Sequence, residues 1–318
     1  MITLTTLKGG LEYRQILIDQ VPDFISADEL TWINCAGLTN QEIEKILKDA
    51  KEIPDFLLED CTTKQRPKIQ DYEDCTSIIF KILVNKSRPL KTVQLNIIFG
   101  EKYLLSIIKD NVELLKTIQT NITKNIGKVN KLGVGYLVYI FLESIVDSYY
   151  PIIDKIDVDI ERLEGDIIKN CRPNTVHKIV SMKKDVLKLR RNIGPEKEIL
   201  RALGRDKFEF VKEDVMLYFR DAYSDILSIA DRIDSQREML SGLMEIYLST
   251  ISNNLNNVMK KLTLVTSLIL VPSFIAGLYG MNVALPLEDR PDAFYIIFLV
   301  IILAVVATVW LFRKREWL

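Results

Sequence analysis

Two long uncharged stretches near the C-terminal end constrain the fold of this chain more than any other feature of its sequence. Residues 262–281 and 293–312 each form a run of twenty residues without a formal charge. At about 1.5 Å per residue, a helix of that length spans roughly 30 Å, the thickness of a bilayer's hydrocarbon core. We therefore expect two transmembrane helices joined by a short turn, with the first 261 residues forming a domain attached to a membrane.

The charges that flank the two stretches predict their orientation. Lys260 and Lys261 precede the first stretch, and Arg313, Lys314 and Arg315 follow the second. The connecting segment carries three acidic residues against one arginine. Because the cytoplasmic flanks of membrane helices are enriched in Lys and Arg, both termini are expected in the cytoplasm. The prediction is a two-pass protein of the cell (plasma) membrane.

The rest of the chain has the composition of a cytosolic domain. Its 42 Lys and Arg against 43 Asp and Glu give no indication of nucleic-acid binding. Residues 1–15 lack a secretory signal, so the N-terminal part is expected to stay inside the cell. A single histidine argues against a Ser-His-Asp site, and we expect neither an enzyme nor an organic cofactor. Four irregularly spaced cysteines are expected to be reduced, mostly buried thiols: Cys35, Cys61, Cys75 and Cys171.

Residues 1–130 are expected to form a cytosolic α/β domain. Asn40 is the predicted N-cap of a short helix over 40–47, and a second helix is expected over 113–122. The β-branched or alternating segments predict strands over 3–7, 15–19, 31–34, 77–84, 92–99 and 103–108.

Residues 131–258 are expected to form a cytosolic helical hairpin and a long stalk helix, followed by a two-span transmembrane domain over 259–318. The hairpin is predicted over 136–168, with a kink or restart at Pro151, and over 175–204, with a kink or break at Gly194-Pro195. Residues 212–281 have the pattern of one continuous helix, which would extend about 105 Å. Its apolar stripe favours association with copies of itself or with the hairpin.

Opposite charges are concentrated on the two arms of the hairpin. Residues 143–166 hold eight acidic residues against Lys155 and Arg162, whereas the returning arm is rich in Lys and Arg. One interpretation is an antiparallel pair held in water by salt bridges. The other is that these clusters shape the approach of an ion to a pore.

The tripeptide Gly280-Met281-Asn282 ends the first uncharged stretch, and Tyr279 precedes it. Amide oxygens at a pore mouth suit a hydrated cation, because Mg²⁺ sheds its waters reluctantly and prefers oxygen ligands. This arrangement resembles the CorA family of magnesium transporters, whose signature is Gly-Met-Asn after Tyr. The resemblance extends along the chain through Thr31-Trp32-Ile33-Asn34, Leu58-Glu59-Asp60, Gln65-Arg66-Pro67-Lys68, Tyr218-Phe219-Arg220-Asp221, Tyr247-Leu248-Ser249 and Trp317-Leu318.

The resemblance implies a funnel-shaped homopentamer with an α/β cytosolic domain, a long α-helical stalk and two C-terminal transmembrane helices. Its transported and regulatory ion would be Mg²⁺, its partners would be the lipid bilayer and divalent cations, and Gly280, Met281 and Asn282 would form the selectivity filter. A transporter of the same fold for cobalt, nickel or zinc is an alternative. A membrane-tethered scaffold that conducts nothing is another, although a mere anchor would need neither Asn282 nor a polar stripe.

One face of the first uncharged stretch has residues spaced by three or four, so they share a side of one helix. From spacing alone, this side can be a helix-packing face, where small residues are common. The resemblance implies that it is the conduction path, with Met259 and Leu262 as a hydrophobic gate. The face consists of Asn256, Met259, Leu262, Thr266, Leu270, Ser273 and Gly277.

The resemblance also implies low-affinity regulatory Mg²⁺ sites between subunits. The acidic residues at matching positions are Glu59, Asp60, Glu143 and Asp221. Carboxylates are suitable hard ligands, although each of the four can equally be an ordinary surface charge. Glu143 stands where the family commonly has Asp, and Asp147, one turn later, can substitute for it.

Overall fold

A seven-stranded mixed sheet organises the first part of the chain. The strands lie in the order β2-β1-β3-β7-β6-β5-β4, with β3 and β7 parallel and the other neighbouring pairs antiparallel. Their bounds are Ile2–Thr6 (β1), Glu12–Gln15 (β2), Thr31–Ala36 (β3), Lys68–Asp71 (β4), Thr76–Leu83 (β5), Thr92–Phe99 (β6) and Tyr103–Ile108 (β7).

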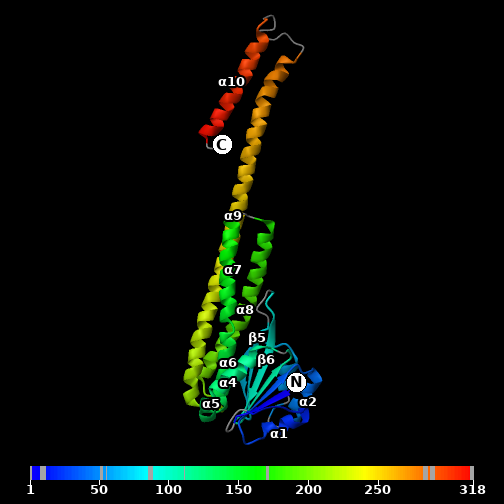
Figure 1. Cartoon of the computed structure of the whole chain (residues 1–318), viewed down its shortest axis with the longest axis vertical. Helices are drawn as coiled ribbons and strands as arrows, with labels where there is room; N and C mark the ends of the chain where they lie inside the picture. The colour runs from blue at the N-terminus through cyan, green and yellow to red at the C-terminus, as the bar shows by residue number, and fades with distance from the viewer. Residues whose placement is uncertain are drawn as a thin grey trace. The chain divides into compact units, whose positions relative to one another are not determined.

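The structure is a computed structural model, drawn in Figure 1. Its chain separates into two units, Met1–Asp166 with Pro173–Leu243, and Ile167–Arg172 with Met244–Leu318. We call them the N-terminal unit and the C-terminal unit. The residues that the structure describes are 2–7, 12–50, 53–54, 56–84, 89–110, 112–169, 172–281, 286 and 291–315.

Five of the six predicted strands are confirmed, and the segment predicted as a strand over 15–19 is wrong. The strand there ends at Gln15, and a 3₁₀ helix, Ile18–Gln20, leads into helix α1, Val21–Ile25. Pro22 stands in the first turn of α1, where its missing N–H costs nothing. The apolar run over 16–18 therefore belongs to a turn that packs beside the sheet.

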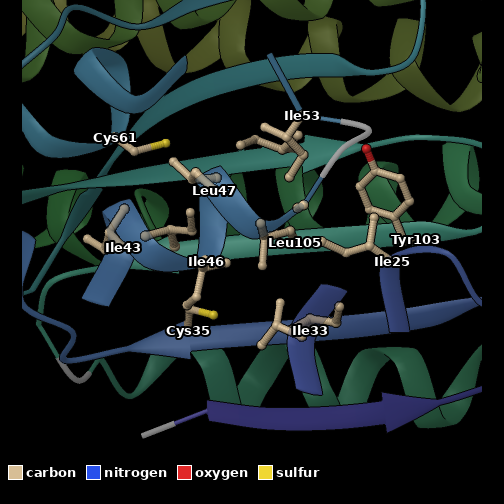
Figure 2. Packing of buried hydrophobic residues seen from close by; sticks show 14 of the residues in the cluster. Ile25, Ile33, Cys35, Ile43, Ile46, Leu47, Ile53, Cys61, Tyr103 and Leu105 are labelled. Carbon is tan, nitrogen blue, oxygen red and sulfur yellow. The ribbon is translucent and has the colours of Figure 1, made fainter. Parts of the chain in front are cut away.

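Helix α2, Asn40–Asp49, covers one face of the sheet. Its N-cap is Thr39 and not Asn40, because the Thr39 hydroxyl accepts from the Glu42 N–H, and the Glu42 carboxylate accepts from the Thr39 N–H at 2.7 Å. This reciprocal pair is a capping box, which satisfies two backbone donors at once. Figure 2 shows Ile43, Ile46 and Leu47 of α2 among the buried side chains above the strands.

Helix α3, Leu57–Thr62, and strand β4 are among the short elements that were not expected from the sequence. Helix α3 carries Glu59 and Asp60, and β4 follows it as the edge strand beside β5. The predicted buried thiols are confirmed for Cys35, Cys61 and Cys75, whereas Cys171 lies outside the described residues.

Helices make up the rest of the described chain. The restart expected at Pro151 is confirmed, because α6 ends at Asp147 and α7 begins at Tyr150, with the proline in its first turn. The expected long helix is also confirmed, as α9 is continuous over 67 residues. The bounds are Leu114–Lys124 (α4), Ile126–Leu132 (α5), Val134–Asp147 (α6), Tyr150–Lys169 (α7), Pro173–Arg205 (α8), Glu213–Tyr279 (α9) and Ala293–Lys314 (α10).

Helix α8 passes through Gly194-Pro195 without ending, so a break there is wrong, and the kink expected as the alternative stays a prediction. Proline removes one helical hydrogen bond, from the N–H of residue 195 to the carbonyl of residue 191. Arg191 lies on the exposed side, where water can replace that bond. The opposite side buries Ile193, Ile199 and Leu200, and this packing stabilises the helix across the proline.

The acidic arm α7 is paired with α9 as well as with α8. Arg232 of α9 reaches both Asp154 and Asp157 of α7 at 2.6 Å. Between α7 and α8 the structure gives Lys178 with Asp166 at 4.0 Å, the outer limit of an ion pair. The acidic residues of α7, which were expected to pair within the two-helix hairpin, therefore also form ion pairs with a third helix, α9.

Candidate functional site

Helix α9 carries the residues of the predicted pathway face. Because the helix is continuous through them, the seven residues from Asn256 to Gly277 do share one side, and all seven are exposed. Partly covered residues, which include Leu264, Leu268, Val271 and Ile275, fall on the opposite side by the 3.6-residue period. In the described part of the C-terminal unit, the predicted face is therefore exposed.

Helices α9 and α10 are the two described helices that are long and apolar enough to cross a membrane. The most apolar 18-residue window of each has no buried residue, with a mean hydropathy of 1.9 in α9 and 2.9 in α10. Such surface is stable in a lipid environment and not in water.

The predicted filter lies where α9 ends. The Gly280 N–H donates to the Ala276 carbonyl at 2.9 Å, and the Met281 N–H donates to the Leu278 carbonyl at 3.3 Å, so the helical turn is closed up to Met281. Asn282 lies outside the described residues.

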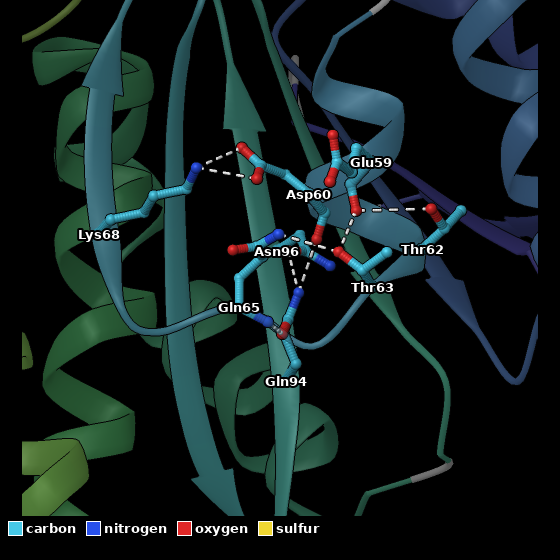
Figure 3. Close-up of polar contacts among 8 residues, drawn as sticks. All are labelled: Glu59, Asp60, Thr62, Thr63, Gln65, Lys68, Gln94 and Asn96. Atoms are coloured by element: carbon cyan, nitrogen blue, oxygen red, sulfur yellow. Dashed lines mark hydrogen bonds and ion pairs between the residues drawn. The ribbon is translucent and has the colours of Figure 1, made fainter.

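Asp60 on α3 is nearly buried, with 8% of its surface exposed, and it is paired with Lys68 of β4. The Lys68 ammonium lies 2.8 Å from Oδ1 and 2.7 Å from Oδ2 of Asp60, as Figure 3 shows. The neighbouring Glu59 is exposed. A cation that binds Asp60 would therefore compete with an ammonium group that is already in place.

Hydrogen bonds from side chains also hold the backbone around Asp60 in place. Gln94 of β6 donates from Nε2 to the Asp60 carbonyl at 2.7 Å and accepts the Gln65 N–H at 2.8 Å (Figure 3). The Thr63 hydroxyl donates to the Glu59 carbonyl at 2.7 Å. These bonds fix the C-terminal end of α3 against the sheet, which positions Glu59 and Asp60.

Glu143 and Asp221 belong to a second acidic group, formed by α6 and α9. Burial raises the pKa of the Glu143 carboxyl, the hydrogen bond from the Tyr139 hydroxyl opposes that rise, and the charges of Asp147, Asp221 and Asp225 add to it. The pKa of Asp147 is raised by burial and by Asp225. A cation bound nearby would relieve this repulsion.

The structure does not gather the four predicted regulatory carboxylates into one site. Among the described residues, no three His, Cys, Asp or Glu side chains are placed to share a metal ion. Sequence reasoning missed Lys68 as the partner of Asp60 and Asp225 as the neighbour of Glu143. Asp225 had a signal, since it follows Asp221 by four residues. Lys68 belongs to a segment that carries the family resemblance, but nothing in the sequence indicated that it pairs with Asp60.

A family model described as "CorA-like Mg2+ transporter protein" matches residues 27–314. The chain belongs to this family. The match includes strands β3 to β7 of the sheet and both apolar helices, α9 and α10, and the family is one of transporters, not of enzymes. Together with the two apolar helices, it makes this CorA-family chain a membrane protein that transports divalent cations.

Curated CorA proteins are similar to this chain along nearly its whole length. The cobalt/magnesium transport protein CorA of Thermotoga maritima is 30% identical over 312 residues, which are 96% of this chain and 89% of that protein. The protein of the same name from Methanocaldococcus jannaschii is 27% identical and covers 95% of this chain and 96% of its own. Zinc transport proteins ZntB from Yersinia pseudotuberculosis are 20% identical over 315 residues.

Solved structures share this CorA fold. The complete structure of the CorA magnesium transporter from Methanocaldococcus jannaschii matches with a TM-score of 0.86 at 24% identity, over 100% of this chain and 99% of that one. The structure of the full-length CmaX protein matches with a TM-score of 0.77 at 19% identity. At these identities the likeness concerns the fold.

Proposed function

We propose that this chain moves Mg²⁺ into the cell through a pore formed by five copies, and that cytosolic Mg²⁺ closes the pore. The observation that carries the proposal is helix α9, whose 67 residues run without a break from the N-terminal unit into an apolar span. Its exposed side bears Asn, Thr and Ser beside apolar residues, a mixture that a lipid anchor does not need.

The proposed pore uses this side as its lining. Copies of α9 would place Asn256, Thr266 and Ser273 along the path, with Leu270 and Gly277 between the polar positions. Met259 and Leu262 would form a dry constriction, and a hydrated cation could not cross this constriction in the closed state. Gly280, Met281 and Asn282 would form the filter, in which amide oxygens hold the hydration shell of Mg²⁺.

The proposed regulation uses the two acidic groups. Glu59 and Asp60 of one copy would meet Glu143 and Asp221 of the next, because no single copy assembles three ligands within its described residues. Few carboxylates with retained waters give weak affinity, as a sensor of millimolar Mg²⁺ requires. A bound ion would stabilise the closed state only to the extent that it prefers that state.

The proposed organisation has three parts, and no organic cofactor enters it. Residues 1–130 form the cytosolic α/β domain, residues 131–258 the hairpin and stalk, and residues 259–318 the pore domain. Both termini would lie in the cytoplasm, as the basic residues that flank the spans favour. The relatives named for cobalt and magnesium match at higher identity than those named for zinc, which favours Mg²⁺ over Zn²⁺ as the substrate.

The test is Mg²⁺ uptake into proteoliposomes that contain the purified protein. The wild type should take up Mg²⁺, driven by an inside-negative potential, and Asn282→Ala should abolish selective uptake while the oligomer survives on size-exclusion chromatography. The matched control is Asn257→Ala, which removes an amide from the side of α9 opposite the predicted face and should leave uptake unchanged. Wild-type uptake by an assembled Asn282→Ala protein would rule out the filter.

A further inference from the structure

Strand β5 lacks a neighbouring strand on one of its two sides at Lys81. Strand β4 pairs only with residues 76–79 of β5, so it ends before Lys81. On the other side, Lys81 lies opposite Gln94 of β6. The Val84 N–H bonds to Lys91 across the same ladder, and hydrogen-bonded pairs alternate along antiparallel strands. The N–H and C=O of Lys81 therefore both point away from β6, toward the side that β4 leaves open.

Two buried side chains occupy that side. The Lys81 N–H donates to Glu196 Oε1 of α8 at 2.9 Å. The Lys81 carbonyl oxygen lies 2.7 Å from the hydroxyl of Tyr149, which precedes α7. The same hydroxyl lies 2.7 Å from Glu196 Oε2. Glu196 has 0% of its surface exposed and Tyr149 has 1%, so bulk water does not reach these groups.

The number of hydrogens decides which form of Glu196 fits this arrangement. The Tyr149 hydroxyl has one hydrogen, yet it contacts two oxygen acceptors, the Lys81 carbonyl and Glu196 Oε2. An ionised carboxylate only accepts, so one of these 2.7 Å contacts would then join two oxygens with no hydrogen between them. A neutral carboxylic acid donates to Tyr149, and Tyr149 donates to the Lys81 carbonyl. Every contact then has its hydrogen.

The charges around Glu196 do not reverse this conclusion. Lys81 is the cation that acts on Glu196, and its ammonium also donates to Gln94 at 2.8 Å. The pKa of Lys81 is lowered, first by burial, and Lys64 contributes to that lowering. Burial raises the pKa of Glu196 to about 7, against the opposing effects of the Lys81 N–H, Tyr149 and the Lys81 charge. Tyr149 itself has a pKa raised well above its usual value, so it stays a donor.

We propose that Glu196 is a neutral acid in the folded protein and that, together with Tyr149, it forms a proton-dependent clasp between helix α8 and the open edge of β5. In the neutral form the pair offers Lys81 an acceptor and a donor, as a neighbouring strand would. Loss of the proton removes one hydrogen bond and leaves a buried charge, which loosens α8 from the sheet.

Hydrogen bonds connect the clasp to Asp60, one of the proposed regulatory carboxylates. From Lys81, the side chain reaches Gln94, and Gln94 in turn holds the Asp60 carbonyl. Ionisation of Glu196 is therefore expected to disturb the support of α3 as well as the packing of α8. The clasp itself does not depend on transport, because it lies wholly within the N-terminal unit.

The test is the thermal midpoint of the full-length protein in detergent, followed from pH 5 to pH 9. The pKa of Glu196 is higher when folded than its usual 4.5, so its stabilising effect is complete below about pH 4.5 and is lost as pH rises to about 7. Wild-type protein should lose roughly 5–10 °C over this window relative to Glu196→Gln. The amide has no proton to lose, and it still accepts from Lys81 and donates to Tyr149.

Glu198→Gln is the matched control. Glu198 lies two residues further along the same helix, but it is exposed and paired with Arg201 at 2.7 Å. This variant should keep the pH dependence of the wild type. The proposal is overturned if Glu196→Gln has the same pH dependence as the wild type. It is equally overturned if Glu196→Gln fails to fold at pH 8, since a required carboxylate cannot be replaced by its amide.

Discussion

The N-terminal and C-terminal units of this chain differ in what covers their apolar side chains. In the N-terminal unit, residues such as Phe80, Phe141 and Phe219 have 0% of their surface exposed. In the C-terminal unit, α10 has no buried residue and the apolar window of α9 is entirely unburied. The first unit covers its core with its own chain, whereas the apolar surface of the second has the character of a surface in lipid.

This difference separates two sources of stability. Burial from water stabilises the sheet domain by roughly 25 cal/mol per Å² of apolar surface. Between helices in lipid that driving force is absent, and close packing and polar contacts replace it. Substitutions in the two units should therefore affect different measurable properties: folding in the first, and conduction or assembly in the second.

The largest expected effect is on folding in the N-terminal unit. Phe219 of α9 is fully buried and packs edge-to-face against Tyr139 at 6.0 Å. Phe219→Ala should lower the free energy of unfolding by about 3–5 kcal/mol, because it leaves a cavity. Leu262→Ala, on the same helix but 57% exposed, should change it by less than about 0.5 kcal/mol.

Denaturant titration of the detergent-solubilised chain provides this measurement. Trp32 is buried in the N-terminal unit with 3% of its surface exposed, so its fluorescence follows that unit. Replacing Trp310 and Trp317 by Phe removes the other two tryptophans. Equal losses from Phe219→Ala and Leu262→Ala would contradict the contrast between the two units.

The second expected effect is on conduction. Leu262→Asn should hydrate the proposed constriction and raise Mg²⁺ leak several-fold at saturating cytosolic Mg²⁺, because the dry neck gains an oxygen ligand. Flux into proteoliposomes or single-channel recording measures the leak. The matched control is Leu264→Asn, on the partly covered opposite side of α9, which should add no leak. A well-expressed Leu262→Asn protein that does not leak would exclude the hydrophobic gate.

The third expected effect is on regulation. Replacing Asp60 and Asp221 together by Ala should weaken the protection from protease that millimolar Mg²⁺ gives to the cytosolic part, and currents should resist inhibition by Mg²⁺. Proteolysis at a series of Mg²⁺ concentrations measures this directly. If the double variant keeps both responses, these carboxylates are surface charges and regulation lies elsewhere.

The smallest expected effect is a stronger response to Mg²⁺, opposite in sign to the effect of the Asp60 and Asp221 double variant. Lys68→Ala removes the ammonium that occupies both oxygens of Asp60. A regulatory cation would no longer compete with it, so the Mg²⁺ concentration for half-protection should fall about two- to threefold. Lys45→Ala, which breaks an exposed ion pair with Asp19 and not the pair at Asp60, is the control and should leave that concentration unchanged. A rise with Lys68→Ala would show that the lysine supports the site instead of competing for it.

Local pattern was sufficient for much of this protein. The two spans, the strands at 92–99 and 103–108 and the unbroken helix α9 were all predictable, because each is encoded by hydrophobicity or period over consecutive residues. That the seven residues from Asn256 to Gly277 share one side of α9 follows from the same period. Sequence also carried the family, since the segments that resemble CorA proteins occur in order along the chain.

Only the tertiary structure decided the features that depend on residues far apart in sequence. Helix α8 continues through Pro195 because its packing outweighs one lost hydrogen bond. Lys68 forms an ion pair with Asp60 because β4 returns beside α3. Glu196 reads in the sequence as one more surface charge, and it became a buried acid because α8 lies over the edge of β5, 115 residues away from Lys81. Sequence determines which elements form, whereas the packing of elements against one another sets the burial, and with it the charge state, of each polar group.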